Sequence, residues 1–145
     1  MKNISTRPAV IQDIDFIFSC VSALTNELFN LEWFRKCFES CLNTPNTYYI
    51  IATCNDINVG YISCHGQKIL HHCGLVFEIQ EMFVLPEFRN LGVGKKLLMN
   101  LEEQLATENY VLLEVTSNMK RLDAHRFYET NGFTRSSYKF KKTKV

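Results

Sequence analysis

The chain has 145 residues, of which 46% are apolar and 21% are charged, and its formal net charge at neutral pH is +1. This length predicts a single domain, residues 1–145, with a hydrophobic core of its own. The small net charge argues against a general nucleic-acid-binding protein, and no apolar run in the sequence reaches the length of a membrane span. Six scattered cysteines without a secretion signal are typical of reduced thiols, so we expect a cytoplasmic protein.

The first half of the chain predicts two helices that are flanked by strands. Asp13 opens the first helix, which ends near Asn26, and Asn30 is expected to cap the second helix, whose apolar residues share one face. Short runs of apolar and β-branched residues predict the strands. In chain order, these strands are residues 4–7, 48–53, 59–64 and 75–84, with turns at residues 55–56 and 71–74.

The second half predicts helices that alternate with strands. A helix led by glycines, with leucines at a spacing of four, follows the strand at residues 75–84. The almost wholly apolar run at residues 111–115 is typical of a buried parallel strand. A helix at about residues 120–130 ends at Asn131-Gly132, and residues 133–140 are expected to form the last strand. The order strand, helix, strand implies a right-handed parallel crossover in an otherwise antiparallel sheet.

The junction between the strand at residues 75–84 and the next helix has the features of a pyrophosphate-binding loop. Pro86 ends the strand, and Gly92 and Gly94 stand where the helix begins. The first N–H groups of a helix have no internal partner and the helix dipole favours an anion, which can approach glycine closely. The loop is not a P-loop, because no Ser or Thr follows Lys95, and it lacks the third glycine of a dinucleotide fingerprint.

Two patterns of residues are more specific than the glycines alone. The first is Val84-x-Pro86-x-x-Arg89-x-x-Gly92-x-Gly94, and the second is Asn118-x5-Ala124-x2-Phe127-Tyr128-x2-Asn131-Gly132-Phe133. They resemble the acyl-CoA motif and the second signature of the GNAT superfamily of N-acyltransferases. The resemblance implies an α/β (α+β) GNAT fold with a mixed, mostly antiparallel twisted sheet of six to seven strands, about four helices and a splayed central strand pair.

The same resemblance implies the reaction and the cofactor contacts. Acetyl-CoA would be the co-substrate, and the amine of a small molecule would attack its thioester directly. Tyr128 would act as the general acid that protonates the departing thiolate, and backbone N–H groups at the end of the central strand would hold the thioester carbonyl. The residues implied in acetyl-CoA binding are Met82, Phe83, Val84, Arg89, Asn90, Leu91, Gly92, Val93, Gly94, Lys95, Asn118 and Tyr128.

Two carboxylates of the central strand are candidates for the base that deprotonates the amine. Glu78 and Glu81 are unusual in a buried strand, although each can also be a solvent-facing residue. Being three apart, they face opposite sides of a regular strand unless a bulge intervenes. His65 is expected opposite Glu78, and together with His71 and His72 it could form a divalent-metal site. The alternative is a turn of surface histidines.

Other residues narrow the resemblance. They are Phe34-Arg35, Pro45-Asn46, the three histidines, Glu78-Ile79-Gln80-Glu81 and the run from Lys120 to Tyr128. Together they resemble the bacterial aminoalkylphosphonate N-acetyltransferases, a group whose activity is associated with a divalent metal. An anionic phosphonate needs cations, and Arg35 and Arg121 are the predicted substrate contacts, with His65 beside them. Asn90-Leu91 departs from the glycine that is common in this loop.

Two alternatives stay open at this point. The first is a GNAT enzyme for another amine: an aminoglycoside, a polyamine or a protein N-terminus. The second is a non-catalytic acyl-CoA-binding regulator, which would keep the glycines but could dispense with Tyr128 and the two glutamates. For the preferred interpretation the expected partner is a small-molecule amine, not nucleic acid or a membrane, and a homodimer is possible because many relatives are dimers.

Overall fold

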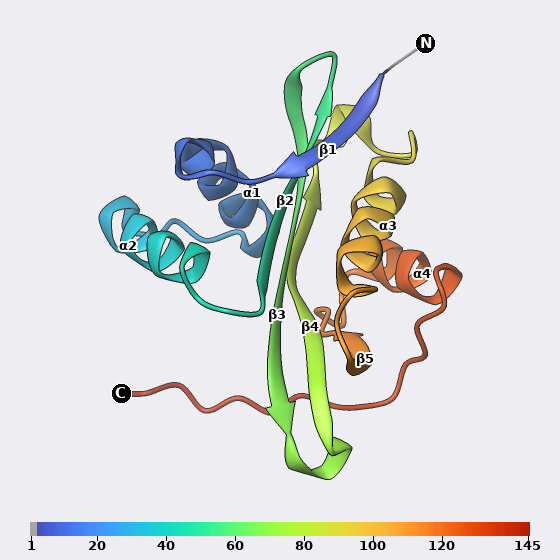
Figure 1. Cartoon of the computed structure of the whole chain (residues 1–145). Helices are drawn as coiled ribbons and strands as arrows, with labels where there is room; N and C mark the ends of the chain where they lie inside the picture. The colour runs from blue at the N-terminus through green and yellow to red at the C-terminus, as the bar shows by residue number, and fades with distance from the viewer. Residues whose placement is uncertain (1–2) are drawn as a thin grey trace.

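A mixed sheet of five strands is the centre of the computed structural model, which describes residues 3–145 (Figure 1). Each strand lies beside the next one in the sequence, and only the pair β4–β5 is parallel. The predicted parallel crossover within an antiparallel sheet is therefore confirmed. The strands are β1 (Ile4–Pro8), β2 (Thr47–Cys54), β3 (Ile57–Ile69), β4 (Gly74–Val84) and β5 (Tyr110–Val115).

Two helices cover each face of the sheet. The helices α1 (Ile14–Thr25) and α2 (Leu31–Leu42) lie on one face, and α3 (Val93–Leu105) and α4 (Leu122–Thr130) lie on the other (Figure 1). The predicted cap of α2 is present, since the side-chain oxygen of Asn30 accepts a hydrogen bond from the backbone N–H of Trp33. Within residues 3–145, no helix combines the length and the apolar character that crossing a lipid bilayer requires.

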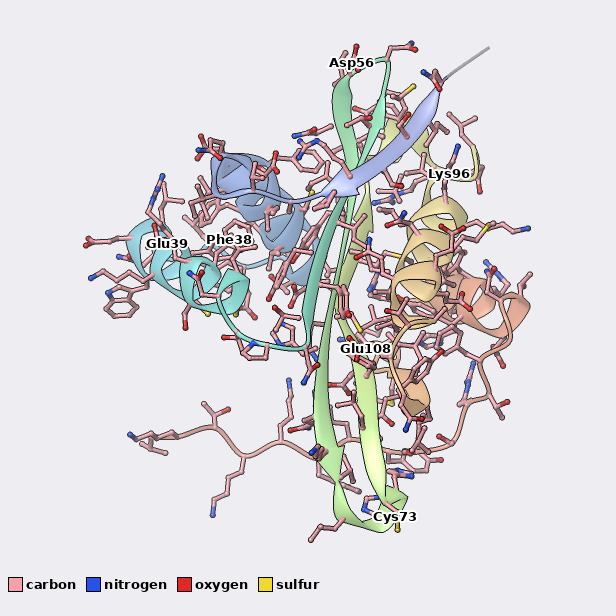
Figure 2. The ribbon with its side chains drawn as sticks, viewed as in Figure 1. Phe38, Glu39, Asp56, Cys73, Lys96 and Glu108 are labelled. Atoms are coloured by element: carbon pink, nitrogen blue, oxygen red, sulfur yellow. The ribbon has the colours of Figure 1, made fainter. Side chains whose placement is uncertain are left out.

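Each face of the sheet has its own apolar core, because strand residues alternate between the two faces. On the face of α1 and α2, the buried residues include Ile17, Ile51 and Tyr61. In Figure 2, Phe38 of α2 lies toward this core, whereas Glu39 points outward. On the other face, α3 contributes most of its buried side chains to a second core with β2, β3 and β4. All six cysteines are free thiols.

A β-bulge in β4 decides where the two glutamates point. Glu81 pairs with Ser63 of β3, and Glu78 pairs with His65, so Gln80 is the extra residue of the bulge. Because Ser63 and His65 are two residues apart on an otherwise regular strand, their side chains lie on the same face. Glu78 and Glu81 therefore share one face as well, the face that carries α1 and α2. The sequence predicted that the two glutamates face opposite sides unless a bulge intervenes, and the structure contains this bulge.

The predicted last strand is wrong. Residues 133–140 have no strand structure, and the described part of the chain has five strands instead of the expected six to seven. The segment leaves α4 and runs past the sheet without pairing with it (Figure 1). After Phe133, which packs against the core, its aromatic side chains are almost fully exposed, at 86% for Tyr138 and 93% for Phe140. The alternation of aromatic and lysine residues gave a strand pattern, but a strand also requires a neighbour for its backbone hydrogen bonds.

Candidate functional site

The parallel strands β4 and β5 separate before β4 ends. Their pairing stops at Ile79 and Val115, whereas β4 continues to Val84. Residues 81–84 remain paired with β3 on one side, and no other strand of residues 3–145 pairs with them on the other side. Backbone N–H and C=O groups along this edge are therefore open to a ligand.

A cavity of about 430 Å³ lies at this separation. Its walls come from the bulged part of β4, the segment after β5, helix α4 and the end of α1. The cavity brings together five of the residues that the sequence singled out: Glu81, Met82, Asn118, Arg121 and Tyr128. These residues come from segments that are up to 47 positions apart in the chain, so only the fold places them together.

Tyr128 is buried at the wall of this first cavity, with 7% of its surface exposed. Its ring packs edge-on against Phe127 and Phe133, at centroid distances of 5.4 and 5.5 Å. Burial raises the pKa of the phenol, and the positive charge of Arg121 partly opposes this rise. The hydroxyl has no hydrogen-bond partner among residues 3–145. A protonated phenol thus stands at the cavity with its donor unused.

Glu81 is held in a fixed position by two buried hydroxyl groups. Ser63 Oγ donates to Glu81 Oε1 at 2.6 Å, and Tyr61 Oη donates to the same oxygen at 3.1 Å. Ser63 Oγ also accepts a hydrogen bond from the backbone N–H of Glu81 at 3.1 Å. Ser63 and Tyr61 are both almost fully buried. The two hydrogen bonds to Oε1 orient the carboxylate of Glu81, and the bond to its backbone N–H holds β4 to β3 beside the bulge.

A second cavity, of about 380 Å³, lies next to the first one. Gln80 lines both cavities, and the second one also contains His65, Glu78 and Glu114. The two oxygens of Glu78 accept hydrogen bonds, one from Gln80 Nε2 at 3.1 Å and the other from Thr116 Oγ1 at 3.3 Å. The two glutamates of β4 thus face different cavities from the same side of the sheet.

The loop before α3 has the geometry that a glycine-led anion site requires. Gly92 precedes α3 with φ at +84°, a conformation that side chains disfavour, and no side chain caps the helix at this residue. Gly94 has a different reason to be glycine, since a Cβ there would lie 3.3 Å from the ring of Phe127. Arg89 Nε donates to the carbonyl of Val84 at 2.9 Å, which ties the loop to the end of β4.

Asn118 begins the turn that leads into α4. Its side-chain oxygen accepts a hydrogen bond from Lys120 N at 2.9 Å, and its carbonyl lies 2.8 Å from His125 Nε2. In the described chain, the amide N–H groups of the Asn118 side chain have no partner. They are the donors that this residue can offer to a ligand in the first cavity.

The histidines do not form the expected cluster. His65 lies opposite Glu78, as expected, but its Nε2 is hydrogen-bonded with Tyr49 Oη. His71 and His72 lie in the turn between β3 and β4, beyond the point at which the strands stop pairing. Within the described residues, no three His, Cys, Asp or Glu side chains are placed to hold a metal ion. The predicted histidine metal site therefore does not fit this structure.

Other predicted and unpredicted residues complete the site. Arg35, a predicted substrate contact, lines neither cavity, and its guanidinium is 3.9 Å from Glu39 on the exposed side of α2. Sequence reasoning missed Ser63 and Tyr61, although a serine within the apolar run of β3 is the kind of signal that could have been used. It also missed Lys141, which lines the first cavity from the C-terminal segment.

Comparison with protein families gives a match over most of the chain. The sequence model described as an acetyltransferase (GNAT) domain matches residues 45–135. The chain is 38% identical over 136 residues to an aminoalkylphosphonate N-acetyltransferase of Salmonella typhimurium. The aligned residues make up 94% of this chain and 88% of that protein. It is 26% identical to an uncharacterized N-acetyltransferase of Bacillus subtilis, with 86% of this chain and 87% of that one covered.

Solved structures of similar shape support the fold. A transcriptional regulator from Bacillus halodurans has a TM-score of 0.87 at 21% identity, with 97% of this chain and 99% of that chain covered. An aminoglycoside N-acetyltransferase solved with CoA has a TM-score of 0.86 at 15% identity, with 99% and 96% covered. At these identities the likeness concerns the fold alone. It bears out the predicted α+β architecture with four helices in the described chain, around a smaller sheet than expected.

Proposed function

Because this chain belongs to the GNAT acetyltransferase family and is an acetyl-CoA-dependent N-acetyltransferase, we propose that its acceptor is the primary amine of a small aminoalkylphosphonate. The identity of 38% to an aminoalkylphosphonate N-acetyltransferase extends over 94% of this chain, and this observation carries the proposal. The first cavity supports it, because a carboxylate (Glu81), a phenol (Tyr128) and a guanidinium (Arg121) line the same space.

In this proposal each residue has one chemical task. Glu81 takes a proton from the acceptor ammonium, which frees the lone pair of the nitrogen for attack on the acyl carbon. Open backbone N–H groups of residues 82–84 stabilise the negative charge on the acyl oxygen. Tyr128 gives its proton to the sulfur as the bond between carbon and sulfur breaks, and the second proton that the nitrogen loses on becoming an amide restores the phenol. Acetyl-CoA supplies the activated acetyl group, and CoA leaves as the free thiol.

The loop between β4 and α3 is the proposed binding site for the phosphates of CoA. Gly92 and the first N–H groups of α3 face no capping side chain, which suits an anion at the helix N-terminus. Backbone groups of Met82, Phe83 and Val84 would pair with the pantetheine arm, and Asn118 would donate its amide to the same arm. The contacts proposed from the loop itself are Arg89, Asn90, Leu91, Gly92, Val93, Gly94 and Lys95.

The second candidate acceptor is a polyamine or an aminoglycoside. The observation in its favour is the second cavity, whose lining contains the carboxylates of Glu78 and Glu114 and no Lys or Arg. A carboxylate pair suits an acceptor with a second positive charge. The alternative of a non-catalytic regulator is not retained, because the family assignment is that of an acetyltransferase.

Release of free thiol from acetyl-CoA, measured against a panel of amines, tests the proposal. We expect aminomethylphosphonate and 1-aminoethylphosphonate to be acetylated with higher kcat/KM than polyamines or aminoglycosides. A chain that acetylates a polyamine and ignores every aminophosphonate would contradict the proposal and favour the second candidate. The assay is run with and without a chelator. The resemblance implies a divalent metal, whereas no three His, Cys, Asp or Glu side chains among residues 3–145 are placed to hold one.

A negative charge placed in the first turn of α3 is expected to abolish cofactor binding. Acetyl-CoA should raise the thermal unfolding temperature of the wild-type protein, and the Gly94→Asp variant should lose this increase, because its carboxylate repels the phosphates. Gly94→Ala is the matched control, since it introduces the same contact with Phe127 without the charge. CoA affinity of Gly94→Asp equal to that of wild type in calorimetry would contradict the assignment of this loop.

A further inference from the structure

The C-terminal segment takes part in the first cavity. After α4 the chain has no regular secondary structure, and it crosses the sheet on its way to the C-terminus (Figure 1). Lys141 of this segment lines the cavity, together with Leu24, Thr25 and Glu27 from the end of α1 and the loop after it. The neighbouring lysines at positions 139, 142 and 144 do not line it. Among the lysines of the C-terminal segment, Lys141 is thus the one placed at the site.

Lys141 has two cationic neighbours in the cavity lining. Lys120 and Arg121 come from the turn between β5 and α4. In the described chain, none of these three cations forms an ion pair with a carboxylate. Arg121 lies close enough to Tyr128 for its charge to act on the phenol, where it opposes the rise in pKa that burial causes. Three unpaired cations around one cavity are suited to an oxyanion.

The phosphates of CoA are expected elsewhere. The loop proposed to bind them, residues 89–95, contributes no side chain to the lining of this cavity. Glu81 lines the same cavity and approaches it from β4, on another wall than the segment after β5. The cavity therefore presents two carboxylates, Glu81 from β4 and Glu27 from the loop after α1, and cations from other elements. This distribution matches a short zwitterion that carries an ammonium and an oxyanion on the same small skeleton.

We propose that Lys141, together with Arg121 and Lys120, forms an oxyanion subsite that holds the phosphonate group of the acceptor. This inference rests on the proposed function and names the part of the same site that recognises the acid end of the substrate. Arg121 can offer two parallel N–H donors to the phosphonate oxygens, and the lysines add point charges. The phosphonate anchored in this way sets the position of the amine relative to Glu81.

Neutralising one lysine of the C-terminal segment tests the proposal. The Lys141→Gln variant should have a KM for aminomethylphosphonate about tenfold higher than that of wild type, with the KM for acetyl-CoA unchanged. Lys141→Arg should restore most of the affinity. Lys142→Gln is the matched control, since this neighbour removes the same charge from the same segment without lining the cavity. With a short alkylamine that has no phosphonate, wild type and Lys141→Gln should have the same KM.

Each outcome separates this inference from the proposed function. A wild-type enzyme that ignores aminophosphonates overturns the proposed function and the subsite with it. A wild-type enzyme that acetylates them, with Lys141→Gln equal to wild type in every KM, overturns the subsite alone. A variant whose KM rises for acetyl-CoA, and not for aminomethylphosphonate, also overturns it, because the lysine would then serve a phosphate of CoA. Equal losses in Lys142→Gln and Lys141→Gln would reduce the effect to the net charge of the segment, which contradicts a built subsite.

Discussion

Replacing Tyr128 by phenylalanine is expected to lower kcat by about ten- to a thousandfold and to leave the KM for acetyl-CoA nearly unchanged. The phenol lies at the wall of the first cavity, and its hydroxyl has no partner among residues 3–145. A thiolate that leaves an acyl group gains a proton in the forward reaction, and the buried phenol is the acid that the cavity offers for this step.

The pKa of Tyr128 gives this prediction a second measurement. Burial raises the pKa above that of an ordinary tyrosine, so the phenol keeps its proton at neutral pH and can act as an acid. In wild type, loss of the phenol proton should therefore make kcat fall at alkaline pH, separately from any decrease at acid pH that protonation of Glu81 causes. In Tyr128→Phe, the profile of log kcat against pH should lack this alkaline decrease, because no group remains to lose a proton.

The same variant has a built-in structural control. Phenylalanine keeps the ring that packs against Phe127 and Phe133, so the thermal unfolding temperature should change little. Single-turnover kinetics show whether the chemical step limits the rate, and this check is needed because product release can mask a slower step. An unchanged rate of the chemical step would leave Tyr128 as a packing residue and remove the general acid from the proposal.

Local features of the fold were predictable from the sequence. The helix α2 begins after Asn30, as predicted, because a capping side chain and an apolar stripe both mark it. The turn at Asn55 and Asp56 is also as predicted, and both residues have positive φ, which these side chains tolerate. Figure 2 shows Asp56 at one end of the long strand β3 and Cys73 beyond its other end. In each case the signal and the structure involve the same few residues.

Features that depend on distant partners were not predictable. The bulge at Gln80 depends on the contacts of Ser63 with Glu81, across two strands, and the strand pattern of β4 does not show it. The failure at residues 133–140 has the same cause, since an alternating pattern does not reveal whether a neighbouring strand exists. The predicted cluster of three histidines does not form for a geometric reason. His71 and His72 lie in the turn after β3, whereas His65 lies well inside that strand.

The bulge also allows a sharp comparison of the two glutamates. We expect Glu81→Gln to lower kcat/KM for the acceptor by about a hundred- to ten-thousandfold, because an amide cannot accept the proton of the ammonium. Glu78→Gln should have a smaller effect, since Glu78 lines the second cavity, away from Tyr128. Glutamine retains an oxygen that can accept from Ser63 and Tyr61, so the bulge should persist and the unfolding temperature should stay close to that of wild type.

The pH dependence of Glu81→Gln distinguishes a lost base from a distorted site. Without a base, the variant can use only acceptor molecules that are already neutral, and their fraction rises about tenfold per pH unit below the pKa of the amine. The residual kcat/KM of Glu81→Gln should therefore rise with pH along that slope and approach the wild-type value at high pH, whereas a misplaced acceptor would give a loss that does not depend on pH. If Glu78→Gln shows the larger loss and this slope, the proton passes to Glu78, and the reacting amine must sit between the two cavities beside Gln80.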